Sequence, residues 1–537
     1  MSSMLPENLV LLLRRSTMAS LTHSSRQNLD KRKRNAEEHE KRQNNRADGV
    51  ADPKANPFTQ EEIEGDTRQP KRKVAVMMGY AGSGYKGMQM MPDQKTIEGD
   101  LFAAFVKAGA ISKANADDPK KSSFVRCART DKGVHAAGNV ISLKLIIEDP
   151  KIVEKINESL PAQIRVWGIE RTIGSFSCYQ ACDSRWYEYL IPTHCFLPPH
   201  PNSYMGQKLP ELAEEAGDLE AFKSRQAETE GFWEKIEDEH IKPLLEAMDP
   251  KIREQVEQAL YHVSPEENEL SDEEDEAAQL VDEGEPLSSK PVEEKNALRE
   301  EETEDTNRFE DACENGKGNN ITLKDLEDIE QAKSSQVSQE TATPAITAEQ
   351  IALRNAIKSL KDAYLKAKRE WRIPEARLKR VQEAFAIYKG THNFHNYTVR
   401  KSFKDPSAKR HILSFNVNPR PIIIGDTEWL SLKVHGQSFM MHQIRKMVGM
   451  AALLVRCGAD VRKTMEESFG ERLYSIPKAP ALGLLLERPV FDNYNTKATG
   501  KFEREEVSFS RYETEMEEFK RKEIYERIFG EEERENV

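Results

Sequence analysis

The sequence predicts an α+β fold of two halves that share a mostly antiparallel central sheet, flanked by helices and containing a central cleft. Strand and helix patterns occur in the first 200 residues and recur after a long charged segment. Composition agrees: of 537 residues, 37% are hydrophobic and 32% are charged, which indicates a packed core beside long solvated segments. No run of about 18 apolar residues occurs, so we expect no membrane partner.

Residues 1–73 are predicted to form a disordered basic tail, because they lack periodicity and are rich in Ser, Asn, Arg and Lys. The clusters Lys31–Arg34, Lys41–Arg42 and Lys71–Lys73 are typical of nuclear import or nucleic-acid binding. A solvated tail without such a role explains them equally well. The apolar then basic stretch Leu9–Arg15 leaves a mitochondrial address open.

The first half is predicted to span residues 74–200. A helix is expected behind Thr96, where Ile97, Leu101 and Phe105 repeat at helical spacing. The expected strands are Val74–Met78, Val125–Thr130, Val140–Ile147, Arg165–Thr172 and Arg185–Ile191.

Residues 201–373 are predicted to form a helical insertion that contains a disordered acidic block at 265–311. This block holds 20 acidic and four basic residues, a net charge of −16. Because the whole chain carries −13, the residues outside the block carry a net charge of +3. The negative total therefore does not exclude a nucleic-acid partner.

The second half is predicted at 374–495, with strands His411–Phe415 and Trp429–Val434 and a helix Met440–Arg456 that ends at Gly458. Residues 496–537 are expected to form a charged helix packed on the surface. Six irregularly spaced cysteines indicate no disulfide framework and favour a reducing compartment.

A glycine-rich pattern, Gly82-Ser83-Gly84-Tyr85-Lys86-Gly87, matches the dinucleotide-binding fingerprint. That motif must open a helix, and Pro92 would break the helix in its first turns. A phosphate-binding P-loop fails because Tyr85 stands where its lysine is required. We therefore favour a turn whose glycines let the backbone approach another segment closely.

Asp131 lies in the segment Arg129–His135, between two predicted strands and flanked by cations. Neighbouring positive charge favours the ionised carboxylate, which suits a nucleophile. Taken alone, such an aspartate is more often a turn former with a satisfied hydrogen bond.

Two further patterns carry polar groups. His442, Arg445 and Gly449 share one face of the predicted helix, where a buried arginine needs a partner such as Asp131. Without context, a surface arginine is the more frequent case. The strand residues Arg185, Tyr187 and Tyr189 also share a face, which suits an unpaired base as well as it suits sheet core.

Cys178, Cys182, His194 and Cys195 are residue types that can bind a metal ion. Their spacing is not that of a zinc finger or zinc ribbon, so no metal ligands are predicted.

The patterns occur together, and together they resemble the TruA-type pseudouridine synthases, most closely the eukaryotic tRNA pseudouridine synthase 1 family. The resemblance covers Val74–Tyr494 without the insertion. The matching segments are Gly79–Gln89, Arg129–Ala136, Ser184–Tyr189, Gly390–Phe394, Phe439–Gly449 and Ala479–Leu484.

The resemblance implies cofactor-free isomerisation of uridine to pseudouridine, mainly in tRNA and in its anticodon stem-loop region, with small nuclear and messenger RNA left open. It implies Asp131 as the nucleophile, Tyr187 as the ring that stacks on the base and assists proton removal, and Arg445 as the ion partner of Asp131. The expected RNA-binding residues are Arg129, Lys132, His135, Arg185, His442 and Lys446.

Bringing Asp131 to Arg445 requires the two halves to form one continuous sheet. We expect a nuclear protein that uses the import machinery, with a mitochondrial pool left open. The alternative is a non-catalytic RNA-binding or RNA-chaperone protein on the same scaffold, although such a protein has no use for a carboxylate in the cleft. The sequence leaves the oligomeric state and a structural metal open.

Overall fold

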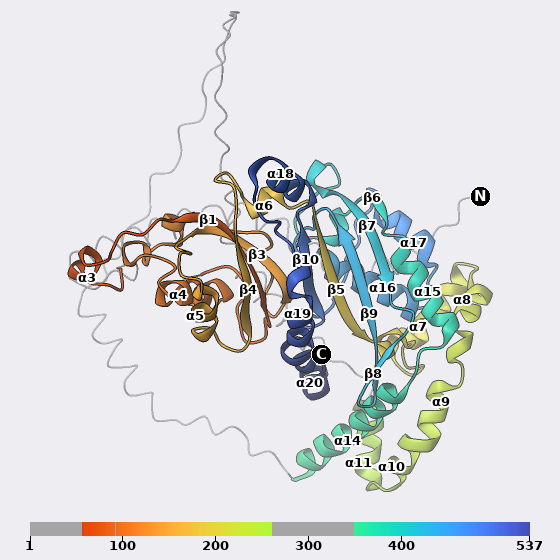
Figure 1. The fold of residues 1–537 in the computed structure, drawn as a ribbon. Helices are drawn as coiled ribbons and strands as arrows, with labels where there is room; N and C mark the ends of the chain where they lie inside the picture. The colour runs from red at the N-terminus through yellow and green to blue at the C-terminus, as the bar shows by residue number, and fades with distance from the viewer. Residues whose placement is uncertain (1–55, 92, 260–347, 537) are drawn as a thin grey trace, which may run out of the picture. The chain divides into compact units, whose positions relative to one another are not determined.

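The computed structural model describes residues 56–91, 93–259 and 348–536 (Figure 1). The predicted acidic block lies outside these residues. The chain divides into two compact units, and the second contains, of the described residues, only 249–259 and 348–358. The first unit holds the sheet and the helices that pack on it. No helix in the described ranges is long and apolar enough to cross a membrane.

The first unit is built on one ten-stranded sheet, which confirms the predicted central sheet. All pairs are antiparallel except β3 with β10, and β10 joins the outer strands of the first half to the rest of the sheet. The order is β4 (Ile164–Arg171), β1 (Arg72–Tyr80), β3 (His135–Leu145), β10 (Leu484–Val490), β5 (Ser184–Pro192), β9 (Thr427–Gly436), β7 (Lys409–Val417) and β6 (Gly390–Asn393), with β2 (Val125–Arg126) on β3 and β8 (Ile422–Ile424) on β9.

One face of the sheet is covered by α4 (Ile97–Lys107), α5 (Ile152–Glu158), α15 (Glu375–Ala386) and α16 (Gln443–Arg456), which share a hydrophobic core with the strands. As predicted, the Thr96 hydroxyl caps α4 by accepting from the Gly99 amide at 3.3 Å. Gly458 follows α16 with φ of 61°, the left-handed conformation that ends many helices, which is also as predicted.

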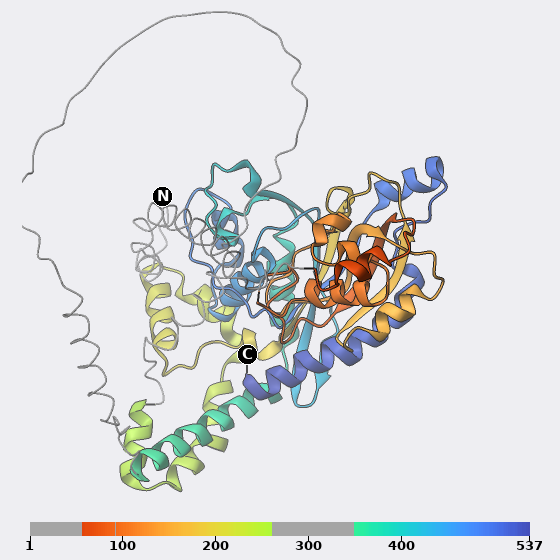
Figure 2. The same ribbon diagram turned by 90° about the vertical axis from the view of Figure 1, so that its left-hand side faces the viewer.

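The opposite face is covered by α18 (Asp492–Phe502) and by a continuous run of α19 (Glu513–Phe519), a π-helical turn (Lys520–Tyr525) and α20 (Glu526–Glu535) (Figures 1 and 2). The prediction of a single helix on the surface at 496–537 is therefore wrong, because this segment forms several helices. Met516, Phe519, Ile524 and Ile528 are buried in the second core of the sheet.

The π-helical turn brings a lysine and a tyrosine behind β5. The Lys520 ammonium lies 2.8 Å from a Glu487 carboxylate oxygen, and the Tyr525 hydroxyl donates to Glu188 at 2.6 Å. Glu188 and Tyr187 are neighbours on β5, so their side chains point to opposite faces of the sheet. This buried polar cluster therefore fixes the strand that carries Tyr187.

The predicted disordered tail at 1–73 is too long. Residues 60–64 form α3 (Gln60–Glu64), which begins with a capping box between Thr59 and Glu62. The Asn56 amide also donates to the Lys113 carbonyl at 2.8 Å, which ties this segment to the first half.

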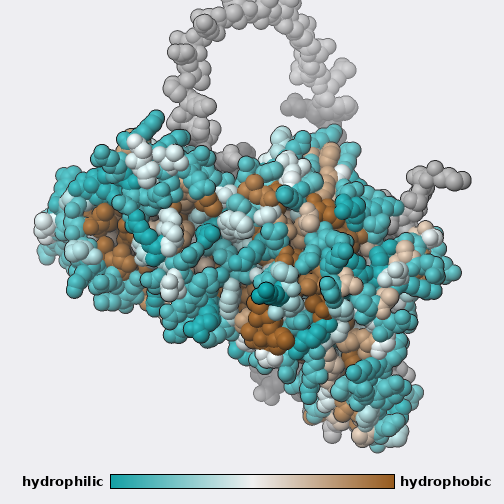
Figure 3. Space-filling model, turned by 45° about the vertical axis from the view of Figure 1, so that its right-hand side comes forward, coloured by the Kyte–Doolittle hydropathy of each residue, from teal (hydrophilic) through white to brown (hydrophobic). Residues whose placement is uncertain are grey.

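The described parts of the predicted insertion are helical. They comprise α7 (Tyr204–Glu215), α8 (Leu219–Gln226), α9 (Phe232–Ile236), α10 (Lys242–Glu246), α11 (Pro250–Ala259) and α14 (Ala348–Glu370), and α17 (Val461–Ser468) follows α16 later in the chain. The surface in Figure 3 is mainly hydrophilic with scattered hydrophobic patches. Exposed isoleucines at 422, 423 and 424 form all of β8.

Candidate active site

The glycine-rich turn after β1 packs against the loop that carries Asp131. A Cβ atom added at Gly82 would lie 2.2 Å from the Val134 carbonyl oxygen. Gly87 has φ of 108°, and its added Cβ would lie 3.1 Å from the Thr130 carbonyl oxygen. The glycines therefore serve close backbone approach, as predicted.

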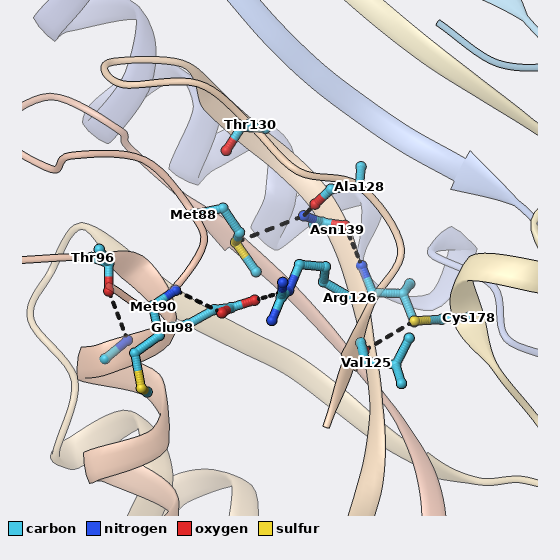
Figure 4. Close-up of polar contacts among 12 residues, drawn as sticks. Met88, Met90, Thr96, Glu98, Val125, Arg126, Ala128, Thr130, Asn139 and Cys178 are labelled. Atoms are coloured by element: carbon cyan, nitrogen blue, oxygen red, sulfur yellow. Dashed lines mark hydrogen bonds and ion pairs between the residues drawn. The ribbon is translucent and has the colours of Figure 1, made fainter. Parts of the chain in front are cut away.

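A buried hydrogen-bond network holds the same loop from the sheet side. The Tyr80 and Thr130 hydroxyls lie 2.8 Å apart. The Asn139 amide donates to the Ala128 carbonyl at 3.1 Å (Figure 4). It also donates to the Tyr80 hydroxyl at 3.3 Å. Met88 is fully buried, and its sulfur lies 3.9 Å from the amide nitrogen of Asn139. Sequence reasoning missed this network, although a polar asparagine inside an apolar strand was a signal for it.

A buried ion pair fixes the entry to this loop. Glu98, in the first turn of α4, pairs with Arg126 of β2 and accepts from the Met90 amide at 2.8 Å (Figure 4). Only 2% of the Glu98 side chain and 23% of the Arg126 side chain are exposed. Burial raises the pKa of Glu98, and the positive charges of Arg126 and Arg129 oppose that rise.

We expect Arg126→Met to lower the free energy of unfolding by about 3 kcal/mol, because the buried Glu98 carboxylate loses its cation. The double variant Glu98→Gln/Arg126→Met should recover most of the loss. The control is Arg72→Met, whose partner Glu148 is exposed, with an expected loss below about 0.5 kcal/mol. Equal losses for the two arginines in urea unfolding would contradict the role of the buried pair.

Asp131 lies just before β3, and its partner is His442. Nδ1 of His442 lies 3.1 Å from Oδ2 of Asp131. The Asp131 side chain is 25% exposed, whereas that of His442 is only 2% exposed. His442 was predicted to contact RNA, but its ring is buried and faces the Asp131 carboxylate instead.

Arg445 and Asp131 both belong to the described residues, and they do not form the predicted ion pair. Nε of Arg445 donates to the Ala479 carbonyl at 2.6 Å, and the Ala479 amide donates back to the Arg445 carbonyl at 3.1 Å. One turn further along α16, a Cβ at Gly449 would lie 2.3 Å from the Pro477 carbonyl oxygen. Arg445 and Gly449 thus hold the segment before β10 against α16.

Tyr187 lies on the same face of β5 as Tyr189, as predicted, and both rings are buried. The Tyr187 ring meets the Phe439 ring edge-on, with centroids 5.3 Å apart. Burial raises the pKa of Tyr187, the positive charge of Arg185 opposes that rise, and the Asp131 carboxylate adds a smaller increase, so the hydroxyl stays protonated near neutral pH. The Tyr189 hydroxyl donates to the Pro480 carbonyl at 2.8 Å and belongs to the core.

Four of the five remaining predicted RNA contacts divide into two pairs. Arg129 and Lys132 are exposed on either side of Asp131. Arg185 instead donates to the carbonyls of Cys127 and Gln437, at 3.0 and 3.2 Å. The Lys446 ammonium donates to the Thr398 carbonyl at 3.1 Å.

His135 cannot contact RNA, which corrects its prediction. It is fully buried at the start of β3, where Nδ1 accepts a hydrogen bond from the Gly82 amide at 3.1 Å. His135 therefore holds the glycine-rich turn in place. Burial lowers its pKa from 6.5 to about 4, because a buried imidazolium is poorly solvated.

This burial predicts a pH-dependent stability. The pKa is about 4 in the folded chain and 6.5 in an ordinary histidine, so the unfolded chain binds the proton first as the pH falls. Stability from neutral His135 is complete above pH 6.5 and is lost towards pH 4, by up to about 3 kcal/mol. His135→Asn, whose Oδ1 can accept from Gly82, should flatten this slope in unfolding experiments. The control His240→Asn, at an exposed residue, should leave the slope unchanged. Equal slopes for the unmutated chain and both variants would show that His135 does not cause the pH dependence.

The residues weighed as metal ligands do not gather. Cys182 lies beside Cys127, whereas the charged neighbours of His194 are Lys368, Arg369 and Arg456. No group of three His, Cys, Asp or Glu side chains in the described residues is arranged to hold a metal ion.

Comparison with known proteins identifies the family. A family model described as tRNA pseudouridine synthase matches residues 384–492. The tRNA pseudouridine synthase 1 of Yarrowia lipolytica is 44% identical over 475 residues, which are 88% of this chain and 74% of that protein. The protein of the same name from Schizosaccharomyces pombe is 40% identical, covering 88% of this chain and 82% of its own. The Saccharomyces cerevisiae tRNA pseudouridine(27/28) synthase is 33% identical over 79% of this chain and 85% of that protein. The chain therefore belongs to the tRNA pseudouridine synthase 1 family.

Proposed function

We propose that the chain isomerises specific uridines of tRNA to pseudouridine, with Asp131 as the nucleophile. The observation that carries the proposal is the setting of Asp131, a partly exposed carboxylate that His442 holds at 3.1 Å, on a loop whose residues Ala128 and Thr130 are hydrogen-bonded to the sheet. Its relatives are named for this activity on tRNA. A protein that only binds RNA would not need an anion at this position.

The reaction relocates the uracil ring without adding or removing atoms. The bond between N1 of uracil and C1′ of ribose breaks, the ring turns, and C5 bonds to C1′. A proton leaves C5 and one is gained at N1, so the change balances without an oxidant, a reductant or a transferred group. We therefore write the reaction with no cofactor.

Asp131 would attack the reacting sugar or base and open the glycosidic bond. The target atoms are inaccessible in a stacked helix, so the nucleotide must be flipped out first. The Tyr187 ring then offers a face for stacking. Because its hydroxyl starts protonated, Tyr187 can accept the C5 proton only after giving its own proton to another group.

Arg129 and Lys132 are the exposed cations closest in sequence to Asp131, and we assign them to RNA phosphates. Arg185 and Lys446 donate to backbone carbonyls, so their role is to shape the site.

We place the target uridines in the anticodon stem-loop region, which the family resemblance implies, and one relative is named for positions 27 and 28 of tRNA. The test is chemical mapping of pseudouridine in unmodified tRNA transcripts incubated with the purified chain. We expect signals at uridines of the anticodon stem-loop region that are absent with Asp131→Asn. Modification at other positions of the tRNA would overturn the assignment. Small nuclear and messenger RNA transcripts in the same assay test whether the chain also modifies these classes of RNA.

We also propose a nuclear protein that is carried by the import machinery, on the basis of the basic clusters between Lys31 and Lys73. Imaging of a fluorescent fusion tests it. Neutralising Lys31–Arg34 should leave the fusion outside the nucleus, and unchanged nuclear signal would contradict the proposal.

A further inference from the structure

We propose that His442 is the positioning residue of the nucleophile, holding one carboxylate oxygen of Asp131 and leaving the other free to react. The inference deepens the proposed function and rests on it. It replaces both the predicted RNA contact of His442 and the predicted pairing of Asp131 with Arg445.

The hydrogen bond has a defined direction. An ionised carboxylate can only accept, so Nδ1 of His442, 3.1 Å from Oδ2 of Asp131, must carry the proton. Within the described residues, Oδ1 takes part in no hydrogen bond or ion pair with the protein. The side chain of His442 therefore selects which oxygen of Asp131 is held and which one faces the substrate.

The backbone of His442 is unusual for a residue that only starts a helix. It has φ of 59° and ψ of 2°, the left-handed region that residues other than glycine seldom adopt, although histidine, asparagine and aspartate do so more often than most. The imidazole makes no capping hydrogen bond to α16. Instead, the Gln443 side chain accepts from the Met440 amide at 2.9 Å. The helix thus gains nothing from the His442 ring, which is turned towards Asp131.

Neighbouring bonds hold this turn in its strained form. The Thr398 hydroxyl donates to the Met441 carbonyl at 3.0 Å, and the Lys446 ammonium donates to the Thr398 carbonyl at 3.1 Å. Strained backbone persists only where the surroundings fix it, and it concentrates at functional sites. These contacts hold the backbone next to His442 in place without a bound substrate.

The matched test compares His442→Gly with His442→Asn. Both residues accept a positive φ, so the backbone is satisfied in each variant. They differ in one respect: the Asn amide nitrogen can take the place of Nδ1 and donate to Asp131, whereas Gly has no donor. The readout is kcat and KM on a tRNA transcript in which the unmutated chain forms pseudouridine, with melting temperature as the folding control.

We expect His442→Gly to lower kcat by about 10- to 100-fold with KM within about twofold, because the carboxylate is no longer held. His442→Asn should restore most of that loss. If His442 instead contacts RNA, glycine raises KM and leaves kcat near normal, which overturns the proposal. Equal losses in both variants also overturn it.

If His442→Gly fails to fold, His442→Gln takes its place, because its amide reaches the position of Nε2 and not that of Nδ1. It should then lose turnover that His442→Asn keeps. The Asp131→Asn protein distinguishes failure of the proposed function from failure of the role of His442. If Asp131→Asn is active, the nucleophile assignment fails. If it is inactive while His442→Gly keeps full turnover, only the role of His442 fails.

Discussion

Asp131→Asn should lower kcat by about 10⁴-fold or more while the affinity for tRNA stays within about threefold. Removing a nucleophile from an enzyme typically costs several orders of magnitude in turnover. Asparagine keeps the shape of the side chain and can still accept from Nδ1 of His442, so the loop should remain in place. Affinity comes from many phosphate contacts, and losing one anion does not weaken attraction to a polyanion.

The measurements are single-turnover pseudouridine formation and equilibrium tRNA binding. The matched control is Asp149→Asn, an exposed carboxylate paired with Lys155, which should leave both unchanged. Near-normal turnover of Asp131→Asn would remove the nucleophile assignment. A large loss of affinity with turnover intact at saturation would make Asp131 a binding residue instead.

Affinity for tRNA should fall by about 10³-fold between 50 and 200 mM salt, because cationic side chains must replace counterions on about six or more phosphates. The total charge of −13 hides this property, since −16 of it resides in residues 265–311. Lys132→Gln should make the slope of log affinity against log salt shallower by about one.

Lys155→Gln is the control for that slope, because its ammonium is already paired with Asp149 at 2.5 Å. It should leave the slope within error of the unmutated chain. A flat salt dependence of the unmutated chain would argue against binding through phosphates.

Most of the longer strands were predictable from sequence, and β10 was not. Its Leu484-Leu485-Leu486 run shows no alternation, because a strand at the centre of the sheet is covered on both faces. The expected strand Val125–Thr130 is shorter in the structure, since the chain leaves β2 after Arg126 to form the loop of Asp131.

The C-terminal helix was misplaced on the surface for a related reason. Its buried residues Phe519 and Ile524 are five apart, a spacing that does not fit an α-helical stripe. A π-helical turn between them returns both side chains to the sheet. A periodicity of 3.6 residues cannot reveal such a turn.

Within the site, sequence patterns supplied the residues and the structure supplied their partners. His442 and Arg445 were expected on one helical face, with the arginine towards Asp131. The left-handed backbone of His442 turns its ring to the carboxylate, while Ala479 holds Arg445. The motif likewise could not show that His135 is buried and Lys132 exposed.

The measurement that tests the central claim most directly is tritium release by the unmutated chain from tRNA carrying uridine labelled with tritium at C5. Formation of the new bond at C5 expels that hydrogen, whereas binding alone does not. We expect one tritium released for each pseudouridine formed, and none with Asp131→Asn. Tight binding of tRNA without tritium release from the unmutated chain would contradict the account and identify an RNA-binding protein on the scaffold of an isomerase.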